Sequence, residues 1–201
     1  MPTSPRIILA SQSSIRQKML GDAGVIFEAL PARVDEETVL MSLQAEGTSP
    51  RDIADALADL KAEKIARKHP DAVVLGSDQI LSFQGNLLTK PKTPEAAQEQ
   101  IKAFSGGTHS LISAAVIYFA GEPVWRNIAI AKMTVRTLTD AYVKAYVDRN
   151  WSEIQHCVGS YQVESEGARL FSRIDGSYHA VLGLPLLPVL GYLMQRGWIE
   201  G

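Results

Sequence analysis

Short apolar runs alternate along this chain with segments whose apolar residues recur at helical spacing. The runs have the length of buried strands and lie at residues 7–10, 27–32, 72–75, 80–83, 87–88, 110–120, 124–138 and 170–174. Helices are expected at 15–23, 50–69, 94–104, 140–150 and 184–195, mostly begun by Ser, Thr or Pro. The alternation predicts one α/β domain over residues 1–201, with a mixed, twisted sheet flanked by helices and two lobes around a central cleft.

Asp78 follows the apolar run at 72–75 and two small residues, so we expect it where a buried strand ends. The runs at 80–83 and 87–88 then predict a hairpin that returns the chain to Lys90. An acid and a base therefore flank one hairpin, as catalysis would require. A turn aspartate and an ordinary surface lysine are the alternative.

Small hydroxyl residues join the first predicted strand to the first predicted helix. Ser11 and Ser13 stand where free backbone N–H groups and the positive end of the helix dipole attract an anion. Arg16 adds a planar set of donors in the first turn. The pattern is consistent with a phosphate site and equally with a routinely capped helix.

A lysine is predicted on the inward face of the helix at 50–69. At about 100° per residue, Lys64 lies within roughly 20° of the direction of Ile53, whereas Lys61 lies off the stripe that Ile53, Leu57 and Leu60 define. An unpaired buried ammonium is costly, so Lys64 is expected to meet a carboxylate or a phosphate. Lys61 is expected to be solvated.

Glu36 belongs to a run of three acids that is typical of a solvated helix start. If the protein uses a divalent cation, Glu36 and Asp78 are the natural suppliers of hard oxygen ligands.

The irregular segment at 151–167 carries Tyr161 and Glu164, and such a long polar loop is often functional. His109 is either a ligand or base or, the interpretation that we favour, a hydrogen-bonded structural residue.

Composition excludes several classes of protein. The chain has 201 residues, of which 46% are hydrophobic. Its formal net charge of −2 gives no electrostatic basis for binding a nucleic acid polymer. Cys157 is the single cysteine, which excludes an internal disulfide and fits a reducing compartment. No signal segment or 18-residue apolar stretch is evident, so we expect a cytoplasmic protein with no membrane partner.

Five separated segments together resemble the Maf family of nucleoside triphosphate pyrophosphatases. They are LASQSSIRQKML, VDEE, GSDQ with the later KP, FSGGTH, and GSYQVESEGARLFSRIDGSYHAVLGLPL. The resemblance spans nearly the whole chain. It implies an α/β fold with a central cleft, a homodimer, and hydrolysis that depends on a divalent metal cation, Mg²⁺ or Mn²⁺. The substrate would be a nucleoside triphosphate, cleaved between its α and β phosphates to the monophosphate and pyrophosphate.

The resemblance also assigns roles to residues. Asp78 would be the general base that activates water, and Glu36 and Asp78 would hold the metal. The triphosphate would be lined by Ser11, Ser13, Arg16, Lys64 and Lys90. The alternative is a protein of a different functional class, a regulator of cell division that binds a nucleotide and does not depend on its hydrolysis.

Three positions bear on the base. Ile15, Gln79 and Glu164 stand where members acting on dTTP and UTP typically have arginine, threonine and glutamine. Gln79 and Glu164 resemble the subfamily that prefers 7-methyl-GTP, and a carboxylate can accept from guanine N1–H and its exocyclic amine together. That subfamily usually has tryptophan where this chain has Ile15. Isoleucine cannot make the cation–π contact that tryptophan would make with a methylated base. We therefore expect a guanine-type triphosphate and leave methylation open, with dTTP or UTP as the alternative.

Overall fold

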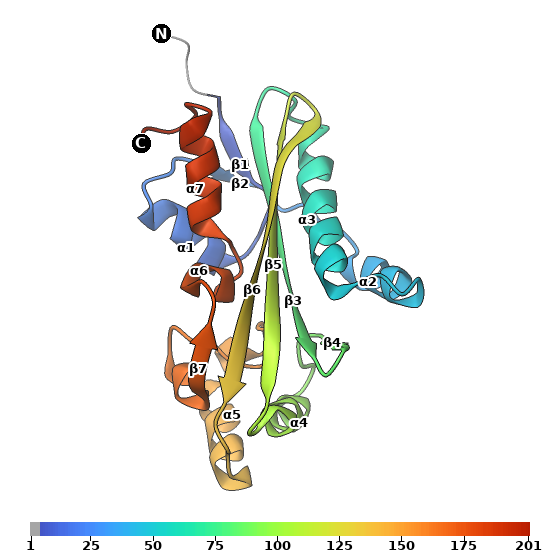
Figure 1. The fold of residues 1–201 in the computed structure, drawn as a ribbon, viewed down its shortest axis with the longest axis vertical. Coiled ribbons are helices and arrows are strands. Elements are labelled where there is room, and N and C mark those ends of the chain that lie inside the picture. The colour runs from blue at the N-terminus through green and yellow to red at the C-terminus, as the bar shows by residue number, and fades with distance from the viewer. Residues whose placement is uncertain (1–4) are drawn as a thin grey trace. The chain divides into compact units, whose positions relative to one another are not determined.

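A computed structural model describes residues 5–201, which form an α/β structure with a mixed seven-stranded sheet (Figure 1). The strand order is β2-β1-β3-β5-β6-β7, and β4 pairs with β3. β1 is parallel to β2 and β3, whereas β4 runs antiparallel to β3 and β7 antiparallel to β6. The strands are Ile7–Leu9 (β1), Glu28–Ala29 (β2), Val73–Phe83 (β3), Asn86–Leu88 (β4), Thr108–Phe119 (β5), Glu122–Val135 (β6) and Phe171–Asp175 (β7). The predicted fold class, an α/β protein with a mixed sheet, is confirmed.

Most of the helices begin where the sequence places capping residues. They are Ser14–Asp22 (α1), Glu36–Ala45 (α2), Pro50–Ala66 (α3), Pro94–Phe104 (α4), Asp140–Ile154 (α5), Tyr178–Val181 (α6) and Leu186–Gln195 (α7), with a 3₁₀ turn at Glu166–Leu170 (η1). The side chains that cap α1 to α5 each accept a hydrogen bond from the N–H three residues later. These caps satisfy N–H groups that the first turn leaves without a helical partner.

The chain divides into two compact units. The first comprises the described part of Met1–Gln79, together with Ile112–Ala129 and Ser177–Gly201, and the second comprises Ile80–Leu111 and Ile130–Gly176. Three of the four boundaries between the units fall within strands, namely β3, β5 and β6, and the fourth falls between β7 and α6.

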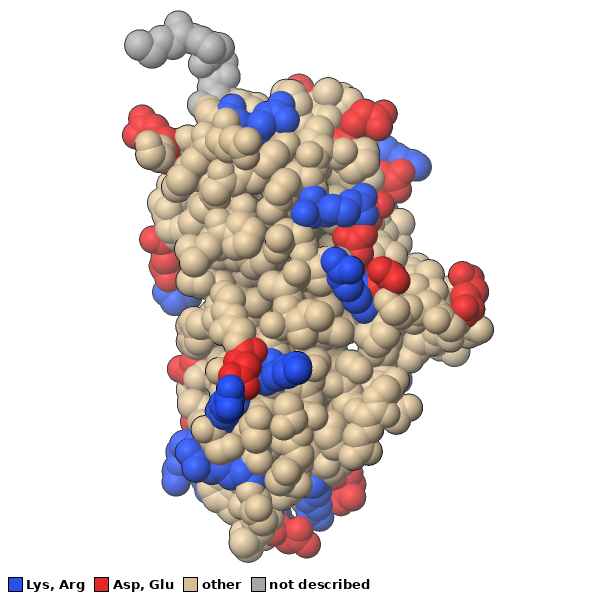
Figure 2. Space-filling view, in the orientation of Figure 1, with Lys and Arg blue, Asp and Glu red and all other residues tan. Residues whose placement is uncertain are grey.

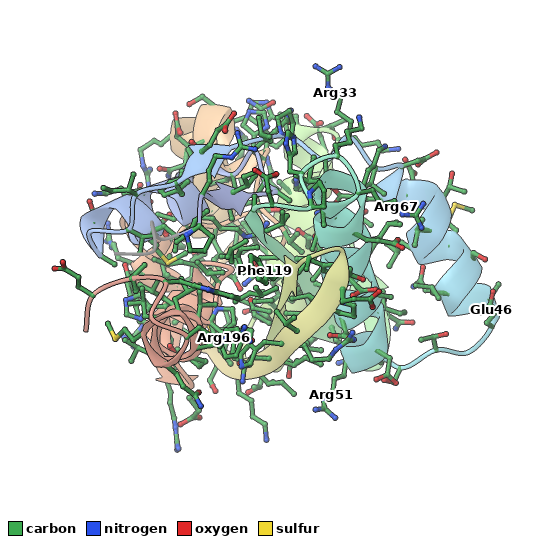
Figure 3. The ribbon with its side chains drawn as sticks, turned by 90° about the horizontal axis from the view of Figure 1, so that it is seen from above. Arg33, Glu46, Arg51, Arg67, Phe119 and Arg196 are labelled. Atoms are coloured by element: carbon green, nitrogen blue, oxygen red, sulfur yellow. The ribbon has the colours of Figure 1, made fainter. Side chains whose placement is uncertain are left out.

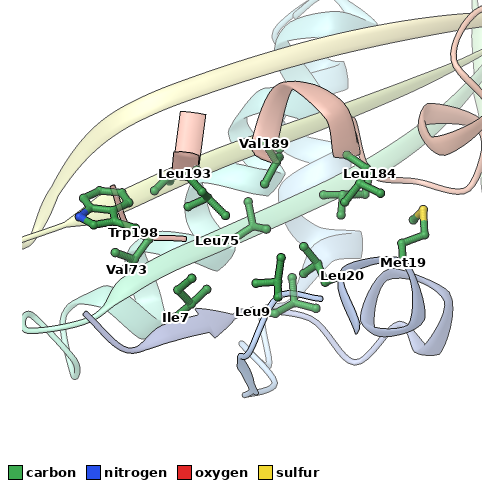
Figure 4. Packing of buried hydrophobic residues seen from close by; sticks show 14 residues of the cluster. Ile7, Leu9, Met19, Leu20, Val73, Leu75, Leu184, Val189, Leu193 and Trp198 are labelled. Carbon is green, nitrogen blue, oxygen red and sulfur yellow. The ribbon is translucent and has the colours of Figure 1, made fainter. Parts of the chain in front are cut away.

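The core of the first unit joins both ends of the chain (Figure 4). Ile7 and Leu9 of β1 and Leu75 of β3 pack in one cluster with Leu20 of α1 and Val189 of α7. All five side chains are at most 5% exposed. This packing fixes β1 and the last turns of α1 against the C-terminal helix.

Charged side chains of both signs lie on the face of the molecule shown in Figure 2. Figure 2 shows lysine and arginine interspersed with aspartate and glutamate on the face in view. Figure 3 shows the side chains of Arg33 and Arg51 of the first unit directed outward. Among the described residues, no helix combines the length and the apolar character needed to cross a bilayer.

Asp78 lies within β3 and not at its end, which corrects the prediction from the sequence. The strand continues through Gly76, Ser77 and Asp78 to Phe83. Besides β1, its neighbour in the sheet is β5, and from Leu81 onward it also pairs with β4. The predicted hairpin is confirmed. Its turn is Gln84 and Gly85, whose φ angles of 51° and 82° suit a two-residue connection.

Other boundaries also differ from the predicted ones. The strand expected at 27–32 is only Glu28–Ala29, and the helix expected to end at 150 continues to Ile154. The short helix α6 was not predicted, because its four residues are too few to show a helical period.

Gly76 allows α3 to lie directly against β3. A Cβ at this position would stand 2.7 Å from the Cβ of Ala62 and closer still to the carbonyl oxygen of Ala58. No real Cβ tolerates such a separation, so the helix and the strand make contact through backbone and small side chains. The close approach sets the depth of every other residue on this face of α3.

We expect Gly76→Ala to lower the free energy of unfolding by about 1–3 kcal/mol or more, because α3 must move away from β3. Gly21→Ala in α1 is the matched control, since a Cβ there would contact nothing within 4 Å. The control should be neutral or stabilising by up to about 1 kcal/mol. Urea unfolding of both variants measures the difference, and equal midpoints would contradict the packing described.

Candidate functional site

The ammonium of Lys61 is buried between two carboxylates. Its Nζ lies 2.5 Å from Oδ1 of Asp78 and 2.9 Å from Oε1 of Glu36. Lys61 and Asp78 are only 8% and 5% exposed, whereas half of the Glu36 side chain is exposed. The group therefore has a buried side, which is Asp78, and an open side, which is Glu36.

Three elements of the first unit bring these side chains together. Lys61 lies on α3, Asp78 on β3, and Glu36 is the first residue of α2, after the N-cap Asp35. The contact between α3 and β3 at Gly76 keeps Lys61 within reach of Asp78. A buried charge requires such a partner, because an unpaired one costs several kcal/mol.

Lys61, and not Lys64, faces inward on α3, which corrects the prediction from the sequence. The buried stripe consists of Ile53, Ala54, Leu57, Ala58, Lys61, Ala62, Ile65 and Ala66. Its centre is displaced from Ile53 toward the alanines, and Lys61 lies near that centre, at roughly 80° from Ile53. Lys64 is exposed and donates to the carbonyl oxygen of Arg33 at 2.6 Å. The sequence pattern was misleading because Leu60, which is only partly buried, was given the weight that belongs to the alanines.

Burial raises the pKa of the Asp78 carboxyl group, and the positive charges of Lys61 and then Arg16 oppose this shift. The same burial lowers the pKa of Arg16, against the attraction of Asp78 and Glu36. The four side chains therefore form one electrostatic group of two cations and two carboxylates. A carboxylate whose pKa is raised is a stronger base than one in water, which suits proton abstraction.

The N-terminus of α1 carries three of the predicted phosphate ligands. The Oγ of Ser13 caps the helix by accepting from the N–H of Arg16 at 3.4 Å, and the Oγ of Ser11 accepts from the N–H of Ser13 at 3.2 Å. The Arg16 guanidinium donates from Nη1 to the carbonyl of Ser77 at 3.0 Å and to Ser11 Oγ at 3.4 Å. The structure thus brings Ser11, Ser13 and Arg16 together beside the strand that carries Asp78.

Gln79 follows Asp78 on β3, and its side-chain amide is held by the protein. Its Nε2 donates to Ser113 Oγ at 3.0 Å and to the carbonyls of Ala180 and Val181 at 2.9 and 3.0 Å. These bonds tie β3 to α6. Ile15, in the first turn of α1, is partly buried.

Lys90 and Glu164 belong to the second unit and are exposed there. Burial raises the pKa of the Cys157 thiol, Glu164 adds to this rise and Lys90 opposes it, so both charges act on the same cysteine. The roles of Lys90 and Glu164 therefore rest on the resemblance to the family and stay predictions.

His109 is buried in an aromatic cluster of the second unit, in agreement with the structural interpretation. It is 1% exposed, stacks on Phe104 at 4.4 Å, and shares a 2.6 Å hydrogen bond between Nε2 and the hydroxyl of Tyr161. Burial lowers the pKa of His109 to about 4. The imidazole is therefore neutral at pH 7 and anchors the segment that follows Tyr161.

The residues suited to a divalent cation are two carboxylates. Within residues 5–201, no group of three or more His, Cys, Asp and Glu side chains is placed to hold a metal ion. Glu36 and Asp78 are instead joined through Lys61. Two carboxylates fit magnesium when a substrate's phosphates and water complete its shell.

We expect Lys61→Met to lower the free energy of unfolding by about 3–5 kcal/mol, because Asp78 loses the partner of its buried charge. The matched control is Lys64→Met, a few residues away on the exposed face of α3, with an expected change within about 0.5 kcal/mol. Chemical unfolding at pH 8 compares the two variants. A smaller loss for Lys61→Met than for Lys64→Met would contradict the buried ion pair.

Comparison with known proteins gives matches along nearly the whole chain. A family model described as Maf-like protein matches residues 6–196. Relatives named nucleoside triphosphate pyrophosphatase are 51% identical over 197 residues in Ruegeria sp. (strain TM1040) and 54% identical over 194 residues in Ruegeria pomeroyi. These alignments cover 98% and 96% of this chain and 99% and 98% of the relatives. A relative from Rhizobium meliloti named 7-methyl-GTP pyrophosphatase is 43% identical over 196 residues, which is 98% of each chain. The chain therefore belongs to the Maf-like protein family.

Proposed function

We propose that this protein is a nucleoside triphosphate pyrophosphatase. The observation that carries the proposal is the group in which Lys61 joins Asp78 to Glu36 beside Arg16. It brings a base, two cations and an exposed carboxylate together next to the N-terminus of α1, an arrangement that suits hydrolysis of a phosphoanhydride. The names of the relatives from Ruegeria support the same activity.

Asp78 acts as the general base. Its Oδ1 accepts from Lys61, so we assign the second oxygen to the attacking water. Asp78 takes a proton as the water oxygen bonds to the α-phosphorus, and the bond from that phosphorus to the bridging oxygen of the β-phosphate breaks. The products are the nucleoside monophosphate and pyrophosphate. Lys61 keeps Asp78 oriented and ionised until the proton arrives.

The phosphates are held by Ser11, Ser13 and Arg16 with the N-terminus of α1, where backbone donors and the helix dipole favour an anion. Lys61 takes the place in the site that Lys64 has in the expectation from the sequence. Lys90 is proposed as a further phosphate ligand because the family resemblance places a lysine there.

A divalent cation, Mg²⁺ or Mn²⁺, completes the proposed site. Glu36 and Asp78 would hold it, and Glu36 has the more accessible side chain. When bound, such a cation neutralises charge on the phosphate oxygens and makes the phosphorus more electrophilic. Its other ligands would be phosphate oxygens and water.

A guanine-type base is the finer part of the proposal. Glu164 is exposed near the end of a segment fixed by His109–Tyr161 and by a 2.7 Å bond from Ser160 Oγ to Gln100 Oε1. A carboxylate presented in this way can accept from the two neighbouring donors of guanine. The 7-methyl-GTP pyrophosphatase name of the relative from Rhizobium meliloti supports this base class.

The activity is tested by pyrophosphate release from GTP, 7-methyl-GTP, UTP and dTTP, first with Mg²⁺ and then with Mn²⁺. We expect Asp78→Asn to lower kcat by about 10²–10⁴-fold, because the amide cannot accept the proton, while nucleotide binding persists. Asp71→Asn, an exposed aspartate just before β3, is the control and should match wild type. Failure of wild type to release pyrophosphate from any substrate with either metal would favour a nucleotide-binding regulator.

The base preference has its own test in Glu164→Gln. We expect the ratio of kcat/KM for GTP to that for UTP to fall about tenfold or more, because the amide no longer accepts two hydrogen bonds from guanine. Glu95→Gln, an exposed substitution on α4, should leave the ratio unchanged. A wild-type preference for UTP or dTTP would overturn the guanine assignment and leave the activity intact.

A further inference from the structure

The backbone carbonyl of Gly183 accepts two side-chain hydrogen bonds at the site. Arg16 Nε donates to it at 2.8 Å and Ser77 Oγ donates to it at 2.9 Å. Gly183 follows α6 and precedes α7, so a residue more than 160 positions from Arg16 determines where its guanidinium lies.

Gly183 is itself held in place by the sheet. Its N–H donates to the carbonyl of Ala180 at 3.0 Å. That same carbonyl accepts from Gln79 Nε2 at 2.9 Å and from Ser113 Oγ at 2.7 Å. Side chains of β3 and β5 therefore fix the segment from α6 to Gly183 through its backbone.

The bonds to protein occupy one side of the guanidinium. Arg16 uses Nε for Gly183 and Nη1 for Ser77 and Ser11. Among the hydrogen bonds of residues 5–201, none uses Nη2. An arginine has five N–H donors in a rigid plane, so fixing Nε and Nη1 also fixes the direction of the Nη2 donors.

Position 183 also requires a residue without a side chain. Its φ is +98°, in the region that favours glycine. A Cβ there would stand 3.1 Å from Nη2 and 3.2 Å from Nε of Arg16. A side chain at position 183 would therefore press on Nε, which donates to the Gly183 carbonyl, and on Nη2, whose donors are left for a ligand.

We propose that Gly183 is a positioning residue for phosphate binding. Its carbonyl orients the Arg16 guanidinium, and its missing side chain leaves the Nη2 donors open to a phosphate of the substrate. This inference rests on the proposed function, since it takes Arg16 as a phosphate ligand. Gly183 thus acts on the reaction through Arg16, without contacting the general base Asp78.

The test is Gly183→Ala against Gly24→Ala. Gly24 also has a positive φ, +75°, but a Cβ there would meet nothing within 4 Å, so it controls for backbone strain alone. We expect Gly183→Ala to raise KM about tenfold or more, as for loss of a charge-assisted hydrogen bond. The rise should be equal for GTP and UTP, because the phosphates are common to both. Equal KM values for the two variants would overturn the inference.

A double-mutant cycle separates positioning from general damage. In an Arg16→Ala background, Gly183→Ala should cause no further rise in KM, because its effect passes through Arg16. The same rise in both backgrounds would contradict the inference. Thermal melts report whether each variant folds. If Gly183→Ala does not fold, Ser77→Ala, which removes the other donor to the Gly183 carbonyl, enters the same cycle with the same criterion. A wild-type protein that hydrolyses no nucleotide would instead refute the proposed function.

Discussion

The ion pair between Lys61 and Asp78 is the constraint around which the charged site of the first unit is built. Two charges at most 8% exposed are stable only together, since either alone would carry a penalty of several kcal/mol. The pair can form only if α3 lies close to β3. Gly76 and the alanines of α3 allow that approach, because none of them has a side chain large enough to separate the two elements. A stripe of small residues thus decides where the charged site is.

The balance of charge in this group shows what the proposed binding of a triphosphate would need in addition to these four side chains. Arg16 and Lys61 carry two positive charges and Glu36 and Asp78 carry two negative charges, so the four side chains are formally neutral together. A triphosphate brings up to four negative charges that these cations, already paired, cannot balance alone. Backbone donors at α1 offset part of this excess. The half-exposed Glu36 carboxylate could accept a further cation, and this charge deficit is the physical argument for the proposed divalent metal.

The sequence predicted those features whose cause is local. The helix Pro94–Phe104 and the hairpin around Gly85 have clear caps, turn residues and periods, and both are found. The predicted buried face of α3 was wrong because it was assigned from the large apolar residues alone. The buried alanines displace the centre of that face toward Lys61. The sequence pattern did not indicate a role for Gly183, because that role depends on its backbone carbonyl and on the absence of a side chain next to Arg16. Such long-range contacts exist only once α6 and α7 have folded onto β3.

The C-terminal segment is therefore more than a closing part of the fold. Leu184 and Val189 belong to the same core as Leu9 and Leu20, so the packing that stabilises β1 and α1 also holds Gly183 against Arg16. A site that needs rigid donors gains from this arrangement, because moving the guanidinium would require disrupting buried apolar contacts. Stability and orientation thus have one physical source in this unit. The charged side chains are few, and their geometry is set by the apolar residues and glycines around them.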